Sequence, residues 1–223
     1  MARFVLVPGA FHGGWWFEPL ARRLRDLGHE AYPVTLTGLG GRAHLASGGV
    51  NLDTHIADVV GVLEGNDLAD VVLVGHSSGG MSITGAAEIV PQRIRALIYL
   101  DAFVPRDGDS VWGLSTQVWR DRYLADVGGD GYSMRPPAFL TEARVTAQPL
   151  ASMLQRIRLT GAADGIDSKH YVFMTEYPQT PFTQFYDRLR LDPSWTVHTR
   201  PFGHNVMAEM PDEVLKLVLH ATE

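Results

Sequence analysis

The chain has 223 residues, of which 45% are hydrophobic and 20% charged, and its formal net charge is −6. This length suits one α/β domain with a full core, and two independent domains would be crowded. The negative charge argues against a nucleic-acid-binding surface. Because the chain contains no cysteine, disulfides, a thiolate nucleophile and cysteine-ligated metals are excluded. No apolar run approaches the length of a membrane span, and the N-terminal residues lead directly into a predicted strand, so we expect a cytoplasmic protein.

Short apolar runs alternate with amphipathic segments along most of the chain. Apolar runs predict strands at residues 71–74 and 94–100, and we also expect strands at residues 4–7, 29–35, 171–174 and 196–200. The amphipathic segments predict helices at residues 19–27, 53–64, 81–90, 182–189 and 211–220. We expect Asp53 or Thr54 to cap the second helix and the glycine-rich residues 37–49 to form a loop. This alternation predicts an α/β fold with a mostly parallel, doubly wound sheet and helices on both faces.

Residues 105–167 interrupt the alternation. The segment is rich in aspartate, glycine and proline, but it also carries tryptophan, tyrosine and methionine side chains. A stretch of about 60 residues without strand periodicity is more typical of an inserted lid than of a plain loop. We therefore expect a single domain over residues 1–223 with a small inserted cap at 105–167.

A Gly-x-Ser-x-Gly pattern at residues 75–79 follows one apolar run and precedes a predicted helix. The five residues alone are a weak signal, because a chain of this composition contains them by chance with a probability of about 0.1. A sharp turn from a buried strand into a helix, however, presents a serine hydroxyl to solvent, and glycines relieve the crowding of that turn. Ser77 is therefore the candidate nucleophile. The alternative is a glycine-rich turn with an incidental serine.

A serine hydroxyl is a poor nucleophile until a base removes its proton, and histidine is the usual base near neutral pH. The site of a parallel α/β sheet lies beyond the carboxyl ends of its strands. Of the nine histidines, His204 comes just after the last predicted strand and before the last helix. An isolated histidine is more often a packing residue, but this position fits the order serine, acid, histidine. We predict that His204 is the base.

Two carboxylates could orient the imidazole of His204 and stabilise its charged form. Asp101 ends the apolar run 94–100, and Glu176 follows the strand predicted at 171–174. A charge at the end of an apolar run is costly unless it is paired, and a histidinium is a suitable partner. This favours Asp101, with Glu176 as the alternative acid. Without a catalytic role, Asp101 would accept backbone N–H bonds in the loop that follows it, and Glu176 would be a solvated loop residue.

An oxyanion hole needs two backbone N–H donors. We expect one from Ser78, directly after the nucleophile, and the other from Ala10 in the glycine-rich loop after the first strand. That loop has neither Gly-Lys-Ser/Thr nor Gly-x-Gly-x-x-Gly, so phosphate binding is not indicated. His12, Trp15 and Trp16 are interpreted as packing residues. The residues that we expect to line the substrate pocket are Gly9, Phe11, Trp112, Trp119 and Asn205.

Three segments resemble the α/β-hydrolase superfamily, and the resemblance covers essentially the whole chain. They are Val-Pro-Gly-Ala-Phe-His-Gly-Gly-Trp-Trp at 7–16, Gly-His-Ser-Ser-Gly-Gly at 75–80, and Gly-His at 203–204. They are most similar to the branch that holds plant hydroxynitrile lyases, salicylate-binding methylesterases and small bacterial esterases. The resemblance implies the roles given above to the serine, the histidine, the two oxyanion donors and the cap.

The resemblance also marks departures from the plant lyases. Those enzymes carry a threonine at the position of Gly9 and a lysine at that of Asn205, which bind the cyanohydrin hydroxyl and stabilise departing cyanide. They place an aspartate about where this chain has Tyr177, next to Glu176. Haloalkane dehalogenases and fungal zearalenone lactonases instead use an acid after the strand that follows the nucleophile helix, the kind of position that Asp101 occupies. A serine nucleophile argues against dehalogenase and epoxide-hydrolase chemistry, where that residue is aspartate.

These observations predict a serine hydrolase that cleaves a carboxylic ester or lactone of a small, fairly apolar substrate through an acyl-enzyme. No metal or organic cofactor is implied, and we expect neither nucleic acid nor membrane as a partner. Formation of a homodimer is left open. One alternative is other chemistry at the same site, such as C–C bond hydrolysis, hydroxynitrile cleavage or cofactor-free oxygenation. Another is a non-catalytic or weakly catalytic ligand-binding protein.

Overall fold

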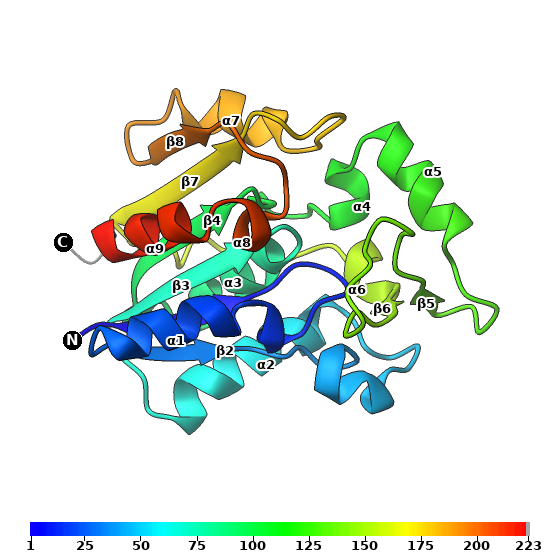
Figure 1. The fold of residues 1–223 in the computed structure, drawn as a ribbon, viewed down its shortest axis with the longest axis horizontal. Helices are drawn as coiled ribbons and strands as arrows, with labels where there is room; N and C mark the ends of the chain where they lie inside the picture. The colour runs from blue at the N-terminus through cyan, green and yellow to red at the C-terminus, as the bar shows by residue number, and fades with distance from the viewer. Residues whose placement is uncertain (222–223) are drawn as a thin grey trace.

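A six-stranded sheet with the strand order β2-β1-β3-β4-β7-β8 forms the centre of the molecule (Figure 1). The computed structural model describes residues 1–221. The strands of this sheet are β1 (Arg3–Val7), β2 (Glu30–Pro33), β3 (Val71–His76), β4 (Ile94–Leu100), β7 (Ser168–Met174) and β8 (Thr196–Arg200). Each neighbouring pair in the sheet is parallel, which confirms the predicted fold class.

Helices cover both faces of the sheet. The helices packed around it are α1 (Glu18–Asp26), α2 (Leu52–Gly65), α3 (Gly79–Ile89), α7 (Thr183–Leu189) and α9 (Pro211–His220). Successive strand residues point to opposite faces: Phe4 and Val72 pack with α1 and α9, whereas Val5 and Leu73 pack with α2, α3 and α7. The inner strands β1, β3 and β4 are near-continuous apolar runs because both of their faces are buried, whereas the edge strands β2 and β8 are more polar and only partly buried.

Two local predictions in the first third of the chain are wrong. The cap of α2 is Asn51: its Oδ1 accepts the Thr54 N–H at 3.1 Å, and the Thr54 hydroxyl accepts the Asn51 N–H at 3.3 Å. The sequence could not distinguish the cap, because Asn51, Asp53 and Thr54 are all residue types that cap helices. In the structure, the extended backbone of Asn51 identifies it as the N-cap. The glycine-rich segment predicted as a loop contains a short 3-10 helix, Gly40–Leu45.

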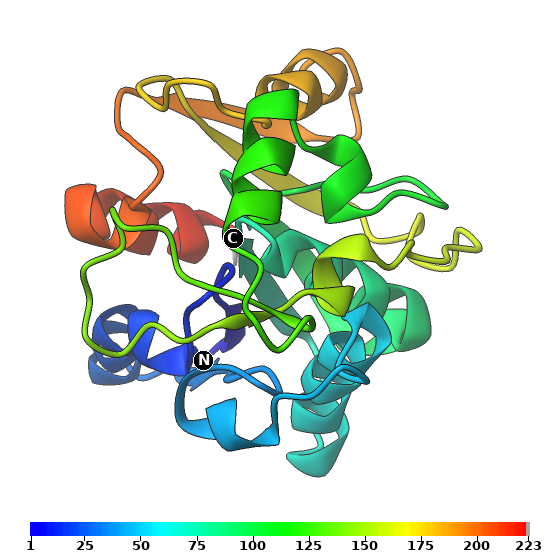
Figure 2. The same ribbon diagram turned by 90° about the vertical axis from the view of Figure 1, so that its right-hand side faces the viewer.

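Residues 105–167, called the insert below, leave the sheet after β4 and return to it at β7. The insert holds the short elements α4 (Val111–Leu114), α5 (Gln117–Ala125), β5 (Ser133–Met134), β6 (Gln148–Pro149) and α6 (Ala151–Leu154). The pair β5 and β6 is antiparallel and was not predicted, because strands of two residues have no periodicity. The insert extends beyond the carboxyl ends of the sheet strands and is seen face-on in Figure 2. Sites of parallel α/β sheets lie at this end.

Among residues 1–221, no helix combines the length and the apolar character that crossing a bilayer requires.

Candidate active site

Ser77 occupies the turn between β3 and α3 and has a left-handed φ of 53°. This conformation is strained for a residue other than glycine. Gly79 gives the turn the room it needs, because a Cβ at that position would lie 2.5 Å from the Val7 carbonyl oxygen. The Ser77 carbonyl accepts the N–H groups of Gly80 at 3.2 Å and of Phe103 at 3.1 Å, and these bonds hold the turn. The serine therefore has the strand–turn–helix context that the sequence predicted.

Ser77 lines a cavity between the sheet and the insert that holds about 610 Å³ of unfilled space, part of it open to solvent. The insert contributes apolar and aromatic walls: Trp119, Tyr123, Pro137, Phe139, Leu140 and Met153. Gly9 and Phe11 line the cavity from the loop after β1. Trp112 does not line it; this residue packs against the hydrophobic core beneath the insert. Asn205 lines an adjoining cavity that also reaches His204.

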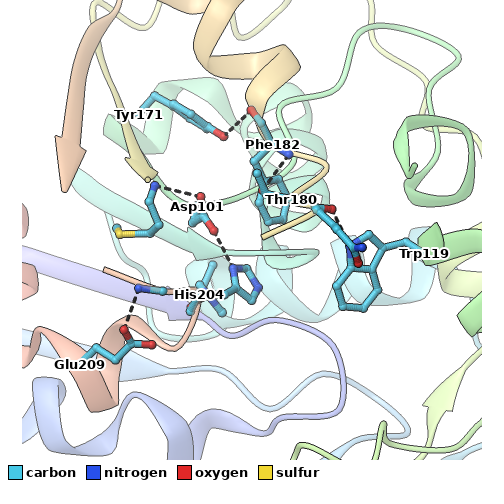
Figure 3. Close-up of polar contacts among 11 residues, drawn as sticks. Asp101, Trp119, Tyr171, Thr180, Phe182, His204 and Glu209 are labelled. Carbon is cyan, nitrogen blue, oxygen red and sulfur yellow. Dashed lines mark hydrogen bonds and ion pairs between the residues drawn. The ribbon is translucent and has the colours of Figure 1, made fainter. Parts of the chain in front are cut away.

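Asp101 and His204 are hydrogen-bonded to each other, with 2.7 Å between Oδ2 and Nδ1 (Figure 3). Asp101 is fully buried directly after β4, and its Oδ1 also accepts the Met174 N–H at 3.2 Å. Burial raises the pKa of Asp101, whereas the hydrogen bond and charge of His204 act to lower it. A neutral imidazole that donates Nδ1–H to a carboxylate has its lone pair on Nε2, which suits it to act as a base.

The loop that carries His204 is held by its own contacts. Glu209, in the short helix α8 (Val206–Glu209), accepts the Gly203 N–H at 2.7 Å (Figure 3). Glu176, the alternative acid, is exposed in the turn after β7. Its backbone N–H bonds the Phe202 carbonyl at 3.1 Å. Of the two carboxylates that the sequence left open, the structure brings Asp101 to His204.

The His204 imidazole lies between other rings. Its centroid is 4.6 Å from that of Tyr177, with 15° between the planes, and 5.3 Å from that of Phe182. His76 lies 4.5 Å away, donates its Nε2–H to the His204 carbonyl at 3.0 Å, and stacks against Trp16. Burial holds the pKa of His76 well below its usual value, so the ring is neutral and adds no charge that would oppose an imidazolium at His204. The sequence did not indicate that these rings surround His204, because contacts between segments far apart in the chain leave no local pattern.

Ala10 and Ser78, the predicted oxyanion donors, both line the cavity at Ser77. Ser78 directly precedes α3, so its N–H lies at the positive end of the helix dipole. Ala10 lies in a turn after β1, and its carbonyl accepts Nδ1–H of His12 at 2.8 Å. His12, interpreted from the sequence as a packing residue, is buried and also lines the cavity.

Comparisons with known proteins show which family the chain resembles. The model of the alpha/beta hydrolase family matches residues 4–217. A carbendazim hydrolyzing esterase from Nocardioides sp. (strain SG-4G) is 39% identical over 234 residues, which cover 96% of this chain and 97% of that protein. An alpha-hydroxynitrile lyase from Arabidopsis thaliana is 34% identical over 103 residues, 46% of this chain and 40% of that protein.

A solved structure shows the same fold. It is an extracellular alpha/beta-hydrolase from a Paenibacillus species, described as sharing structural and functional homology with tobacco Salicylic Acid Binding Protein 2. Its TM-score is 0.85 at 22% identity, and the match covers 99% of both chains. The family model, the full-length relative and the fold lead to one conclusion: the chain belongs to the alpha/beta-hydrolase family, in the branch that holds hydroxynitrile lyases and methylesterases.

Proposed function

We propose that this protein is a serine hydrolase that cleaves a carboxylic ester or lactone through an acyl-enzyme intermediate. Its similarity to a carbendazim hydrolyzing esterase over nearly the whole length of both chains supports an ester hydrolase. The observation that carries the serine mechanism is the 2.7 Å hydrogen bond between Asp101 and His204, beside the cavity that Ser77 lines. This is the acid–base pair that a serine nucleophile requires.

In the proposed reaction, Nε2 of His204 takes the hydroxyl proton as Oγ of Ser77 attacks the ester carbonyl. The N–H groups of Ala10 and Ser78 stabilise the oxyanion. Asp101 stabilises the imidazolium, which passes its proton to the departing alcohol. His204 then takes a proton from water as the water oxygen attacks the acyl-serine ester. The imidazolium returns this proton to Oγ of Ser77 as the bond between Oγ and the acyl carbon breaks, and the acid is released.

The walls of the cavity support a small and fairly apolar substrate. Trp119, Phe139 and Met153 of the insert line the same cavity as Ser77 and His204, which supply polar groups. Pockets of this kind bind an apolar group and orient it by a few polar contacts. Carbendazim, which appears in the name of the 39% identical esterase, is a substrate to test beside simple esters.

The site does not favour hydroxynitrile cleavage. The plant lyases that the sequence resembles carry a threonine and a lysine where this chain has Gly9 and Asn205. A Cβ at position 9 would lie 2.7 Å from Cβ of Ser77, and Asn205 supplies no positive charge to stabilise cyanide.

Replacement of the serine tests the proposal. We expect the unmodified protein to release a burst of p-nitrophenol from a short-chain ester and to be labelled by a fluorophosphonate probe. Ser77→Ala should abolish the labelling and lower kcat by at least about 10³-fold, whereas Ser47→Ala, at an exposed loop serine, should change neither. A Ser77→Ala variant that retains turnover would refute the mechanism. An unlabelled and inactive wild type would favour the ligand-binding alternative.

A further inference from the structure

The loop after β1 makes a tight turn in a strained conformation. The N–H of His12 lies 3.4 Å from the carbonyl oxygen of Gly9, and Phe11, the third residue of this turn, has a φ of 70°. A positive φ at the third position is typical of a type II turn, which favours glycine or asparagine there. A phenylalanine persists in this conformation only where the surrounding structure fixes it.

Hydrogen bonds from the insert fix this turn. The Phe11 N–H donates to Oε1 of Gln148 at 3.0 Å, and the Phe11 carbonyl accepts the Thr146 N–H at 3.0 Å. Within the loop, Nδ1–H of His12 donates to the Ala10 carbonyl at 2.8 Å. The peptide group that joins Ala10 to Phe11 is therefore bonded at its oxygen by His12 and at its N–H by Gln148.

Gln148 is itself held in a single orientation. Its side chain is buried, its Nε2 donates to Oγ of Ser152 at 2.7 Å, and the Ser152 hydroxyl donates to the Pro149 carbonyl at 2.6 Å. Since only the amide oxygen can accept the Phe11 N–H, these partners fix which way the amide points. Gln148 also lines a small cavity together with Gly9 and Ser78.

We propose that Gln148 is a positioning residue for the oxyanion hole, through which the insert holds residues 9–12 in the conformation that aims the Ala10 N–H at the reacting carbonyl oxygen. The inference rests on the proposed acyl transfer at Ser77. Without the Gln148 oxygen, a buried N–H loses its partner, and the turn can relax toward a conformation that suits phenylalanine better. A misdirected donor weakens binding of the transition state more than binding of the substrate.

Gln148→Met tests this role because it removes the acceptor at nearly constant volume. We expect kcat to fall about 10- to 100-fold while KM stays within about threefold. Affinity for a trifluoromethyl ketone, which binds as a tetrahedral adduct at the serine, should fall by the same factor as kcat/KM. Gln148→Glu keeps an oxygen toward Phe11 and should recover activity relative to the Met variant. Ser152→Ala removes the Nε2 partner with little change in volume, and it should lower kcat more mildly, again without raising KM.

Gln155→Met is the matched control. Oε1 of Gln155 accepts the Asp53 N–H at 3.0 Å, so this variant also removes a glutamine bond between the insert and the domain, but away from the turn. We expect its kcat to equal that of the wild type.

Two results would overturn the role of Gln148. One is an equal loss of kcat in Gln155→Met and Gln148→Met, which would indicate general docking of the insert. The other is an unchanged kcat in both Gln148→Met and Ser152→Ala. Either result, in a wild type that is active and labelled at Ser77, leaves the proposed hydrolase intact. If the wild type is not labelled, the proposed serine hydrolase itself is refuted, independently of the role of Gln148.

Discussion

Asp101 and Glu176 show how burial separates two carboxylates with similar places in the sequence. Asp101 follows β4, a strand in the interior of the sheet, and is fully buried, so its charge depends on His204 and the Met174 N–H. Glu176 lies two residues beyond β7 and is exposed. Removing the partner of a buried charge destabilises a protein far more than removing the partner of an exposed charge.

Asp101→Asn should therefore lower kcat by about 10³- to 10⁴-fold, because an amide cannot stabilise the imidazolium and favours the wrong tautomer of His204. The same change at the exposed site, Glu176→Gln, should leave kcat within twofold of the wild type. Steady-state hydrolysis of a p-nitrophenyl ester, corrected for active protein by fluorophosphonate titration, measures both. A larger loss in the Glu176 variant would reverse the assignment of the acid.

At the scale of elements, the site is assembled from segments that follow different strands. The loop after β1 carries Ala10, the turn after β3 carries Ser77, and the loop after β8 carries His204. Because parallel strands end at one edge of the sheet, residues far apart in sequence meet there. The insert adds apolar side chains to the walls of the cavity, and its Gln148 accepts a hydrogen bond from the loop after β1.

The capping box of α2 gives a stability prediction for a single element. Asn51→Ala removes the acceptor for the Thr54 N–H and should lower the free energy of unfolding by about 1 kcal/mol. Asn51→Asp keeps an acceptor oxygen and should stay close to the wild type. Urea denaturation at neutral pH measures both. Equal stability of the Ala and Asp variants would show that the side-chain oxygen contributes nothing.

At the scale of the whole molecule, buried histidines make stability depend on pH. Burial lowers the pKa of His76 and of His55, and burial with the nearby His198 and His220 lowers that of His170 from 6.5 to about 4. The unfolded chain therefore binds more protons than the folded protein between about pH 6.5 and pH 4. The free energy of unfolding should fall as the pH decreases through this window. The raised pKa of Asp101 has the opposite effect on the free energy of unfolding. Because it is one carboxyl against several imidazoles, we expect the effect of the histidines to be larger.

Urea denaturation at pH 7.5 and at pH 5 checks this dependence, and the midpoint should be lower at pH 5. His170→Gln, which removes one imidazole with a lowered pKa, should narrow the difference between the two midpoints. His44→Gln, at an exposed histidine, should leave the difference unchanged. A protein that is more stable at pH 5 than at pH 7.5 would contradict the argument.

Much of the fold and part of the candidate site could be predicted from local patterns. The bounds predicted for β4 and α9 coincide with those observed, because an apolar run and helical periodicity reflect which faces are buried. The predicted bounds of β8 also coincide with those observed, although β8 is a partly exposed edge strand. Ser77 and His204 could be proposed as candidates because a strand–turn–helix and a loop after the last strand are also local patterns. The elements of the insert were not predicted. Four of them have only two to four residues, which show no period, and α5 buries one of its nine residues, Tyr123, so it has no apolar face.

The sequence by itself determined the order of strands and helices, the parallel sheet and the two candidates for nucleophile and base, because each depends on residues within one segment. Only the tertiary structure decided which carboxylate meets His204, since Asp101 and Glu176 both follow strands. It also brought Gln148 to Phe11 across 137 positions and Tyr177 onto the His204 ring. Such contacts depend on how distant segments pack, and neither segment has a sequence pattern that indicates its partner.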